Sequence, residues 1–220
     1  MPRSQRTRPV TLSKTKPKTK EAKNNLITEV QKALRQFRYA YVVEIANERN
    51  NILKKIRDEV KPGRLFLGKN KAIQLALGVD EASAELPNSH RLSAFVSGHR
   101  GLLCTDLSTS EMSALLERHD QSEYARTGCI ATGAVSLEEG ADALSTFPHS
   151  IEPHLRSLGL PTSLQNGKIV LMGDYKVCEE GERLGKEQCE ILKLLGVPLT
   201  MFRARAVVGW EKSGIFSKIE

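Results

Sequence analysis

The spacing of apolar residues alternates between helical and strand patterns in the first half of the chain. Apolar residues recur at helical spacing from about Lys20 to about Arg38, and at four-residue steps over 48–60, where Pro62 and Gly63 end the helix. Short apolar runs between such segments indicate buried strands. We expect strands at 40–46, 64–67 and 101–106, and further helices at 70–77, 90–96 and 108–119. Strands that alternate with helices favour parallel βαβ units in a layered α/β domain.

The pattern changes after Gln121. The following stretches are strand-like and punctuated by glycine, with helical segments at 151–160 and 186–195 between them, as is typical of an α+β unit. The closing segment, 200–216, is again strand-like, so we infer that the chain leaves a first domain, builds an insertion and returns. We therefore predict a layered α/β domain interrupted by a smaller inserted α+β domain. The predicted parts are a flexible arm at 1–18, the α/β domain at 19–121 plus 199–220, and the insertion at 122–198.

Charge is distributed unevenly among these parts. The formal net charge is +7, and the first 24 residues hold eight basic side chains against one acid. Residues 121–198, in contrast, carry a net charge of −4. Residues 1–18 mix Pro, Ser and Thr with basic residues and few apolar ones, a composition that favours flexibility and polyanion binding. The candidate RNA-binding residues of this arm are Arg3, Arg6, Arg8, Lys14, Lys16 and Lys18.

Several protein classes do not fit this sequence. No apolar run approaches the ~20 residues that a membrane-spanning helix needs, and no apolar segment follows the basic start as in a secretory signal. We therefore expect a protein of the cytosolic or nuclear side. The four cysteines form no CxxC pair, which disfavours a zinc knuckle or a thioredoxin motif and predicts reduced, mostly buried thiols: Cys104, Cys129, Cys178 and Cys189.

Residues 63–70, GRLFLGKN, nearly match the phosphate-binding pattern GxxxxGK[ST]. The match fails at Asn70, which has no hydroxyl for magnesium, and at RLFL, which reads as a strand instead of a loop. What remains is local: Gly68 allows a ligand to approach the backbone, and Lys69, Asn70 and Lys71 stand at a helix start, where anions are favoured. We expect an RNA phosphate there, with an ordinary solvated helix start as the alternative.

Residues 32–71 contain eleven basic side chains against four acids, which favours a phosphate footprint. The alternative is that these charges are simply solvated helix faces. Aromatic residues make up only 5% of the chain, too few for a base-stacking sheet, so recognition should act through backbone charge and RNA shape. The eleven are Lys32, Arg35, Arg38, Arg49, Lys54, Lys55, Arg57, Lys61, Arg64, Lys69 and Lys71.

The sequence shows no catalytic pattern. His149 and His154 are five residues apart and so lie on different faces of a helix, and neither GxSxG nor HExxH occurs. His90, His99 and His119 have no cysteine or acid at metal-ligand spacing. The acidic cluster Glu179, Glu180 and Glu182 reads as solvated surface. We therefore expect that the protein is not an enzyme and that it binds neither a cofactor nor a metal.

Five strings along the chain resemble the L10-like ribosomal stalk-base protein family. Within that family, FPHSIEPHLRSLGLPT (147–162) and the basic start make the chain most similar to the ribosome assembly factors. The five strings are LFLGKNKAI (65–73), RGLLCTDLS (100–108), YARTGCIA (124–131), LGLPTSLQNGKIVLMGDYKVCEEGERL (158–184) and LKLLGVPLTMF (192–202).

The resemblance implies a split α/β domain that binds the GTPase-centre region of large-subunit ribosomal RNA, with an insertion that projects away. It also implies a nucleolar placeholder that holds the stalk site on the pre-ribosome until the mature stalk protein replaces it. The implied RNA contacts are Gly68, Lys69 and Asn70. Charge and position add Lys54, Lys55, Arg57, Arg64 and Lys71.

The expected partners are ribosomal RNA at the stalk base, a neighbouring ribosomal protein of the L11/L12 type and other pre-ribosomal factors, with no membrane. We expect location in the nucleolus and nucleus, and passage to the cytoplasm on pre-ribosomes stays open. Because a mature stalk protein continues past the return strand and this chain stops at Glu220, we expect no binding of acidic stalk proteins. Two alternatives remain: a mature stalk-base protein lacking that extension, and a phosphate-handling enzyme at 63–70.

Overall fold

The computed structural model describes residues 20–140 and 144–219, and the chain divides into two compact units. Unit 1 comprises the described residues of Met1–Val42, Pro62–Asp106 and Val208–Glu220. Unit 2 comprises those of Val43–Lys61 and Leu107–Val207. The predicted arm, 1–18, lies outside the described residues, so its six basic side chains stay a prediction.

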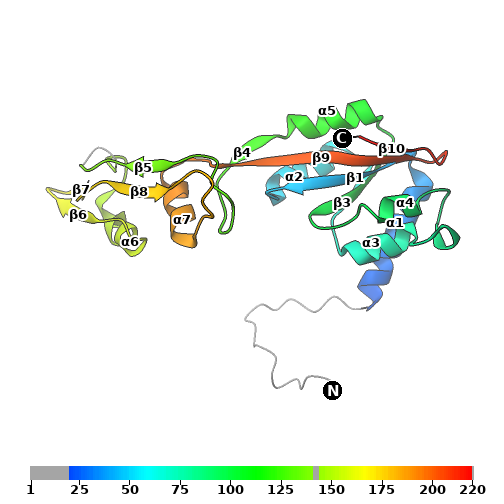
Figure 1. The fold of residues 1–220 in the computed structure, drawn as a ribbon, viewed down its shortest axis with the longest axis horizontal. Coiled ribbons are helices and arrows are strands. Elements are labelled where there is room, and N and C mark those ends of the chain that lie inside the picture. The colour runs from blue at the N-terminus through cyan, green and yellow to red at the C-terminus, as the bar shows by residue number, and fades with distance from the viewer. Residues whose placement is uncertain (1–19, 141–143, 220) are drawn as a thin grey trace, which may run out of the picture. The chain divides into compact units, whose positions relative to one another are not determined.

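The main sheet has six strands, of which five follow the order β10-β9-β1-β3-β2 and β4 pairs with β9 off this path (Figure 1). Strands β1 and β9 each contribute residues to both units. The alternating burial of β9 from Thr200 to Ala206 reflects the strand period of two, with one side of the strand in the core. The strands are β1 (Tyr39–Ala46), β2 (Arg64–Phe66), β3 (Arg100–Thr105), β4 (Gln121–Glu123), β9 (Thr200–Glu211) and β10 (Phe216–Lys218).

The prediction of parallel βαβ units is wrong for β2 and β3. These strands pair antiparallel, with Arg64 opposite Cys104 and Phe66 opposite Leu102. Between them the chain forms two helices that pack on each other, α3 (Asn70–Leu77) and α4 (His90–Ser93), with a 3-10 turn, η2 (Glu81–Ser83), on the way. The connection therefore returns to the end of the sheet that it left, whereas a parallel crossover ends at the opposite one.

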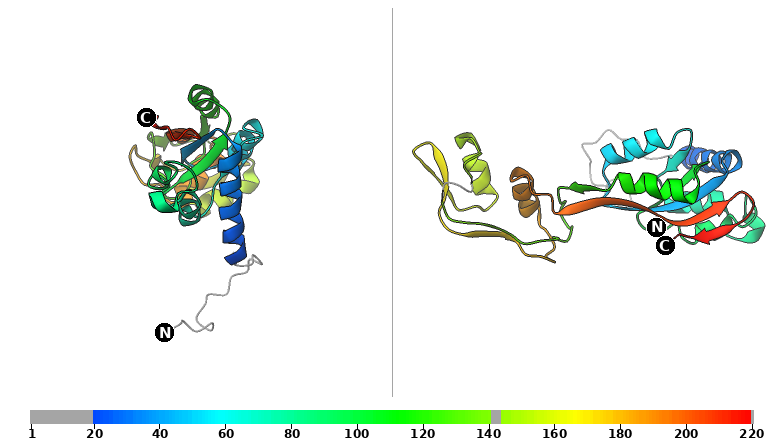
Figure 2. Two further views of the ribbon diagram at one scale, coloured as in Figure 1. Left: turned by 90° about the vertical axis from the view of Figure 1, so that its right-hand side faces the viewer. Right: turned by 90° about the horizontal axis from the view of Figure 1, so that it is seen from above.

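Unit 1 is built on an amphipathic helix, α1 (Lys20–Gln36), which packs against α3 (Figures 1 and 2). The helical spacing of its apolar residues places Val30, Ala33 and Leu34 on one buried face. The hairpin of β9 and β10 is anchored by Trp210, which is 1% exposed and whose indole Nε1 donates to the carbonyl oxygen of Pro87 at 2.9 Å. Burial of such a large side chain with its polar atom satisfied fixes the end of the sheet in this unit.

Unit 2 contains two helices of the predicted first domain, α2 (Asn50–Glu59) and α5 (Thr109–Arg118). Helix α2 buries Ile52, Leu53 and Ile56. Helix α5 begins at a capping box, in which the backbone N–H of Ser108 donates to the Glu111 carboxylate at 2.9 Å. The apolar spacing thus predicts both of these helices, with ends shifted by one or two residues.

The rest of unit 2 forms its own small core around Leu144, Leu171 and Leu192. Asn166 and Gly167, both at positive φ, form the turn of one hairpin, as a two-residue hairpin turn requires. The prediction of a layered α/β domain with a smaller α+β insertion is confirmed. The elements are β5 (Val135–Leu137) paired with β8 (Tyr175–Cys178), the hairpin β6 (Thr162–Gln165) and β7 (Lys168–Leu171), η3 (His149–Ile151), α6 (Glu152–Ser157) and α7 (Lys186–Leu194).

Both connections of this smaller core run along one another. Strand β4 pairs with the start of β9, with Glu123 opposite Thr200, and the Thr200 hydroxyl donates to the carbonyl oxygen of Glu123 at 2.9 Å. Arg49 forms an ion pair with Glu123, and Arg205 forms one with Asp120. None of the helices in the described residues is long and apolar enough to cross a membrane.

Candidate nucleic-acid interface

The start of α3 presents two lysines to solvent. Lys69 is the residue that precedes the helix, Asn70 is its first residue, and the Lys69 and Lys71 side chains are both exposed. No side chain caps this helix end. The first amides of a helix lack partners within the helix, so this end combines free donors with two cations. The predicted helix start is confirmed.

Gly68 and Asn70 have structural roles at this position. A Cβ atom on Gly68 would lie 3.1 Å from Cδ2 of Leu26, so glycine allows α1 to pack closely here. The side-chain amide of Asn70 donates to the carbonyl oxygen of Gly98 at 3.0 Å and ties the helix start to the loop before β3. These two residues position the segment, while Lys69 and Lys71 supply its charge.

The phosphate-loop resemblance at 63–70 does not survive in the structure. Residues 64–66 form β2 and pair in register with β3, so their backbone groups belong to a sheet ladder. A phosphate-binding loop needs consecutive amides that point inward around the anion. The segment therefore lacks the geometry of a nucleotide site.

Four of the eleven basic residues between 32 and 71 are held by acids within the chain. The pairs are Arg35 with Glu85, Arg38 with Glu211, Arg49 with Glu123 and Lys61 with Asp58. Hydrogen bonding to Lys61 lowers the pKa of the Asp58 carboxyl, and hydrogen bonding to Glu211 raises the pKa of the Arg38 guanidinium. These four cations neutralise neighbours on the protein itself.

The other seven are exposed and form no ion pair or side-chain hydrogen bond within the described residues. Six of them are the basic residues outside the arm that the sequence selected as RNA contacts. Such side chains keep their full charge for an external anion. The seven are Lys32, Lys54, Lys55, Arg57, Arg64, Lys69 and Lys71.

These seven residues belong to two different units. Arg64, Lys69 and Lys71, with Lys32, lie in unit 1. Three lie on α2 in unit 2, where they are exposed while Ile52, Leu53 and Ile56 are buried: Lys54, Lys55 and Arg57.

A groove of about 370 Å³ lies beside Lys69 in unit 1. The start of α1 contributes Lys23, Asn25 and Leu26 to its lining, and Leu67 and Gly68 form the other side. Sequence reasoning missed Lys23 and Asn25 as neighbours of Lys69, because α1 and α3 are more than thirty residues apart along the chain. The amphipathic face of α1 was the only signal of their proximity.

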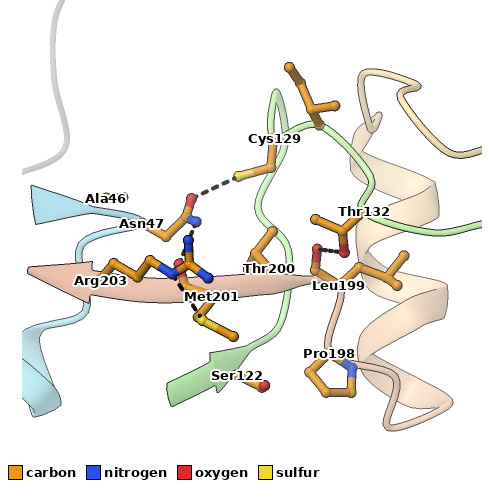
Figure 3. A pocket seen from close by; sticks show the side chains of 11 residues that line it. Ala46, Asn47, Ser122, Cys129, Thr132, Pro198, Leu199, Thr200, Met201 and Arg203 are labelled. Carbon is orange, nitrogen blue, oxygen red and sulfur yellow. Dashed lines mark hydrogen bonds between the residues drawn. The ribbon is translucent and has the colours of Figure 1, made fainter. Parts of the chain in front are cut away.

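Unit 2 contains a pocket of about 530 Å³ at the base of the small core, and its side chains hold backbone in place (Figure 3). The Asn47 amide donates to the carbonyl oxygen of Met201 at 2.8 Å, and the Thr132 hydroxyl donates to that of Leu199 at 2.8 Å. Asn47 has φ of 52°, a conformation that asparagine tolerates better than most residues. The Cys129 thiol lies 3.6 Å from Oδ1 of Asn47. The polar groups of this pocket thus support structure, and they form no pair of nucleophile and base.

Residues that could carry catalysis or bind metal are dispersed. Within 20–140 and 144–219, no group of three or more His, Cys, Asp or Glu side chains could hold a metal ion. His119 and His154 each contact a single glutamate, Glu59 at 3.2 Å and Glu190 at 3.3 Å. All four cysteines are free and three are buried, as predicted, and burial raises the pKa of Cys104 to about 12.

Comparisons with known proteins decide the family. The model of ribosomal protein L10 matches residues 18–121, and the model of the insertion domain in the 60S ribosomal protein of the L10 type matches residues 125–197. Ribosome assembly factor mrt4 of Schizosaccharomyces pombe is 34% identical, with 97% of this chain and 93% of that protein covered. The chain belongs to the Mrt4 family of ribosome assembly factors.

Other relatives separate the two branches of the L10-like proteins. Ribosome assembly factor MRT4 of Saccharomyces cerevisiae is 33% identical, with 93% of this chain and 92% of that protein covered. Large ribosomal subunit protein uL10 of Thermococcus gammatolerans is 25% identical, and the match covers 80% of this chain and 52% of that protein. The predicted resemblance to the assembly-factor branch is confirmed.

Proposed function

We propose that this protein is a non-enzymatic ribosome biogenesis factor that binds the GTPase-centre RNA of the large-subunit precursor. In that role it holds the stalk site until the mature stalk protein replaces it. The observation that carries the proposal is the pair of exposed lysines at the start of α3, Lys69 and Lys71, which form no ion pair within the described chain. Membership in the Mrt4 family supports the same role.

The RNA contacts we propose fall in three groups. Lys69, Lys71 and Arg64 supply phosphate contacts in unit 1, and Gly68 with Asn70 shape the backbone that presents them. The α2 cations and the basic arm add charge from elsewhere in the chain. Phosphate contacts fix the register of a protein on RNA, and the shape of the RNA then provides specificity.

The domain boundaries belong to the proposal. Residues 19–121 with 199–220 would form the RNA-binding domain, and residues 122–198 the insertion; the ranges of the two family models, 18–121 and 125–197, support this division. The −4 charge of residues 121–198 suits contacts with basic proteins better than contacts with RNA.

The proposed setting is the pre-ribosome in the nucleolus and nucleus. Its expected neighbours there are a ribosomal protein of the L11/L12 type and other assembly factors. Co-purification with nucleolar large-subunit precursors is the result that supports an assembly factor. Association with translating ribosomes would instead support the mature stalk-base protein.

A salt titration of RNA binding tests the proposal directly. The full chain is titrated by gel shift against the GTPase-centre fragment of large-subunit ribosomal RNA and against an unrelated hairpin of equal length. We expect tighter binding to the ribosomal fragment at every salt concentration, because shape recognition does not depend on counterion release alone. Equal binding to both RNAs would show that only nonspecific charge attraction is present and would contradict the proposed site.

A further inference from the structure

Two phenylalanines and two cations form an interleaved cluster in unit 1. Phe95, which follows α4, and Phe216 of β10 have ring centroids 5.8 Å apart with an angle of 38° between their planes. The Arg91 guanidinium lies 5.6 Å from the centroid of Phe216, and the Lys218 ammonium lies 5.9 Å from that of Phe95. Each ring thus holds a cation contributed by a neighbouring element.

The cluster keeps its charge available. Arg91 and Lys218 are exposed, whereas both rings are partly buried, and neither cation forms an ion pair or side-chain hydrogen bond with a described residue. A cation over an aromatic face is attracted to it yet keeps its outer donors free. The rings therefore restrict where the two charges lie without neutralising them.

Acids are missing from the surrounding chain. Residues 86–105 and 212–219, which build the cluster, contain no Asp or Glu, and neither do residues 60–79, which include the start of α3. Three described acids border the two stretches that build the cluster, and all three are bonded: Glu85 to Arg35, Glu211 to Arg38, and Asp106 to the backbone N–H of Arg38. The local field is therefore positive.

The cluster is joined to the start of α3 by one short loop. Asn70 donates to Gly98 in that loop, and Arg100 at its end donates to the carbonyl oxygen of Phe95 at 3.3 Å. Gln74 of α3 also donates to the carbonyl oxygen of Val96 at 2.9 Å. Lys69 and the aromatic cluster thus flank a loop that hydrogen bonds hold on both sides, within a single unit.

We propose that the cluster of Arg91, Phe95, Phe216 and Lys218 is a second RNA contact, which binds backbone phosphates of the strand that passes Lys69. The inference rests on the proposed function, because it extends the same interface across the 97–100 loop. The ligand is a polyphosphate backbone: the donors are exposed and cationic, and each is held near a fixed position by a ring. Cations restricted in this way lose less conformational freedom on binding than free lysines do.

The test compares two charge-neutralised double variants in the gel-shift titration with the GTPase-centre fragment. Arg91→Gln with Lys218→Gln removes the two proposed phosphate ligands. Lys168→Gln with Lys193→Gln removes the same charge from exposed positions on β7 and α7 and serves as the control. Each phosphate that the protein ceases to bind lowers the slope of log K against log salt by about 0.7 to 0.9, so we expect the first variant to lose about 1.5 in slope and the control to lose almost none.

A third variant tests the role of the rings. Phe216→Leu keeps an apolar side chain in the hairpin but removes the ring under Arg91, so we expect a smaller loss of affinity with an unchanged charge. Arg91→Lys should retain most of the binding, because the charge stays. Melting temperatures of all variants establish that the fold is intact.

The inference is overturned if the Arg91 and Lys218 double variant binds with the affinity and salt slope of its control. In that case the two cations only cover the rings of Phe95 and Phe216. Lys69→Glu separates this failure from failure of the proposed function. If Lys69→Glu weakens RNA binding and the double variant does not, only the second RNA contact is refuted. If neither variant weakens binding, the whole proposed interface is refuted.

Discussion

Reversal of the charge at Lys69 should weaken RNA binding without lowering the stability of the fold. Lys69 forms no ion pair in the described chain, so Lys69→Glu breaks no internal ion pair. The new carboxylate would lie at the N-terminal end of α3, where a negative charge stabilises a helix by about 0.3–1 kcal/mol. For a chain of this size that gain raises the melting temperature by up to about 4 °C.

RNA binding should change in the opposite direction. Removal of one phosphate ligand and the added repulsion should cost at least about 1 kcal/mol, or about fivefold in Kd. The slope of log K against log salt should fall by about 1. The assay is the gel-shift titration with the GTPase-centre fragment at several salt concentrations, beside a thermal melt of each protein.

Lys168→Glu is the matched control, because it makes the same charge reversal at an exposed residue of β7. It should leave RNA affinity close to that of the unaltered protein. If Lys69→Glu binds as tightly as Lys168→Glu, the RNA face lies elsewhere. If Lys69→Glu melts several degrees lower, the reasoning about the helix end is refuted.

Three further predictions concern other parts of the chain. Deletion of residues 1–18 should flatten the salt dependence of RNA binding by about 0.7 to 0.9 for each phosphate that the arm had bound, and an unchanged slope would mean that the arm binds protein. Arg49→Ala should lower the free energy of unfolding by about 1.5–3 kcal/mol in denaturant titrations, because the Arg49 and Glu123 side chains are only 15% and 21% exposed; a loss below about 0.5 kcal/mol would contradict this role. The Cys104 thiol should resist disulfide reagents at pH 8 until the protein unfolds. Because burial raises its pKa from 9.0 to about 12, the native state holds this proton more tightly, and its contribution to stability is lost as pH rises from about 9 to about 12.

Local patterns along the chain predicted most of the elements. The predicted helix at 70–77 coincides with α3, and the buried strand at 40–46 differs from β1 by one residue. In these two segments the spacing of the apolar residues alone indicates the type of element. The first strand-like stretch predicted after Gln121, residues 127–137, is a strand only over Val135–Leu137. Gly128 at φ 92° directs the chain into a turn, and Ile130 keeps a single bridge to Arg183.

Strand direction and the aromatic cluster depend on contacts between distant segments. Whether β3 runs with or against β2 is decided by how α3 and α4 fold back, and no local pattern specifies that. Phe95 and Phe216 are more than a hundred residues apart, so no local pattern in the sequence indicates that their rings pair. The sequence of charges predicted the unpaired cation at the start of α3 better than the aromatic content predicted the cluster. Lys69 has no acid near it in sequence, and it forms no ion pair with a described residue.

The pairing of β4 with the start of β9 brings the two ends of the insertion side by side. Glu123 and Thr200 lie opposite each other in one antiparallel ladder, so the chain enters and leaves the small core through a single stem. A two-residue turn placed between these positions would close an ordinary β-hairpin. Gain, loss or exchange of the segment between them is therefore a local event, which requires no rearrangement of the sheet that carries the stem.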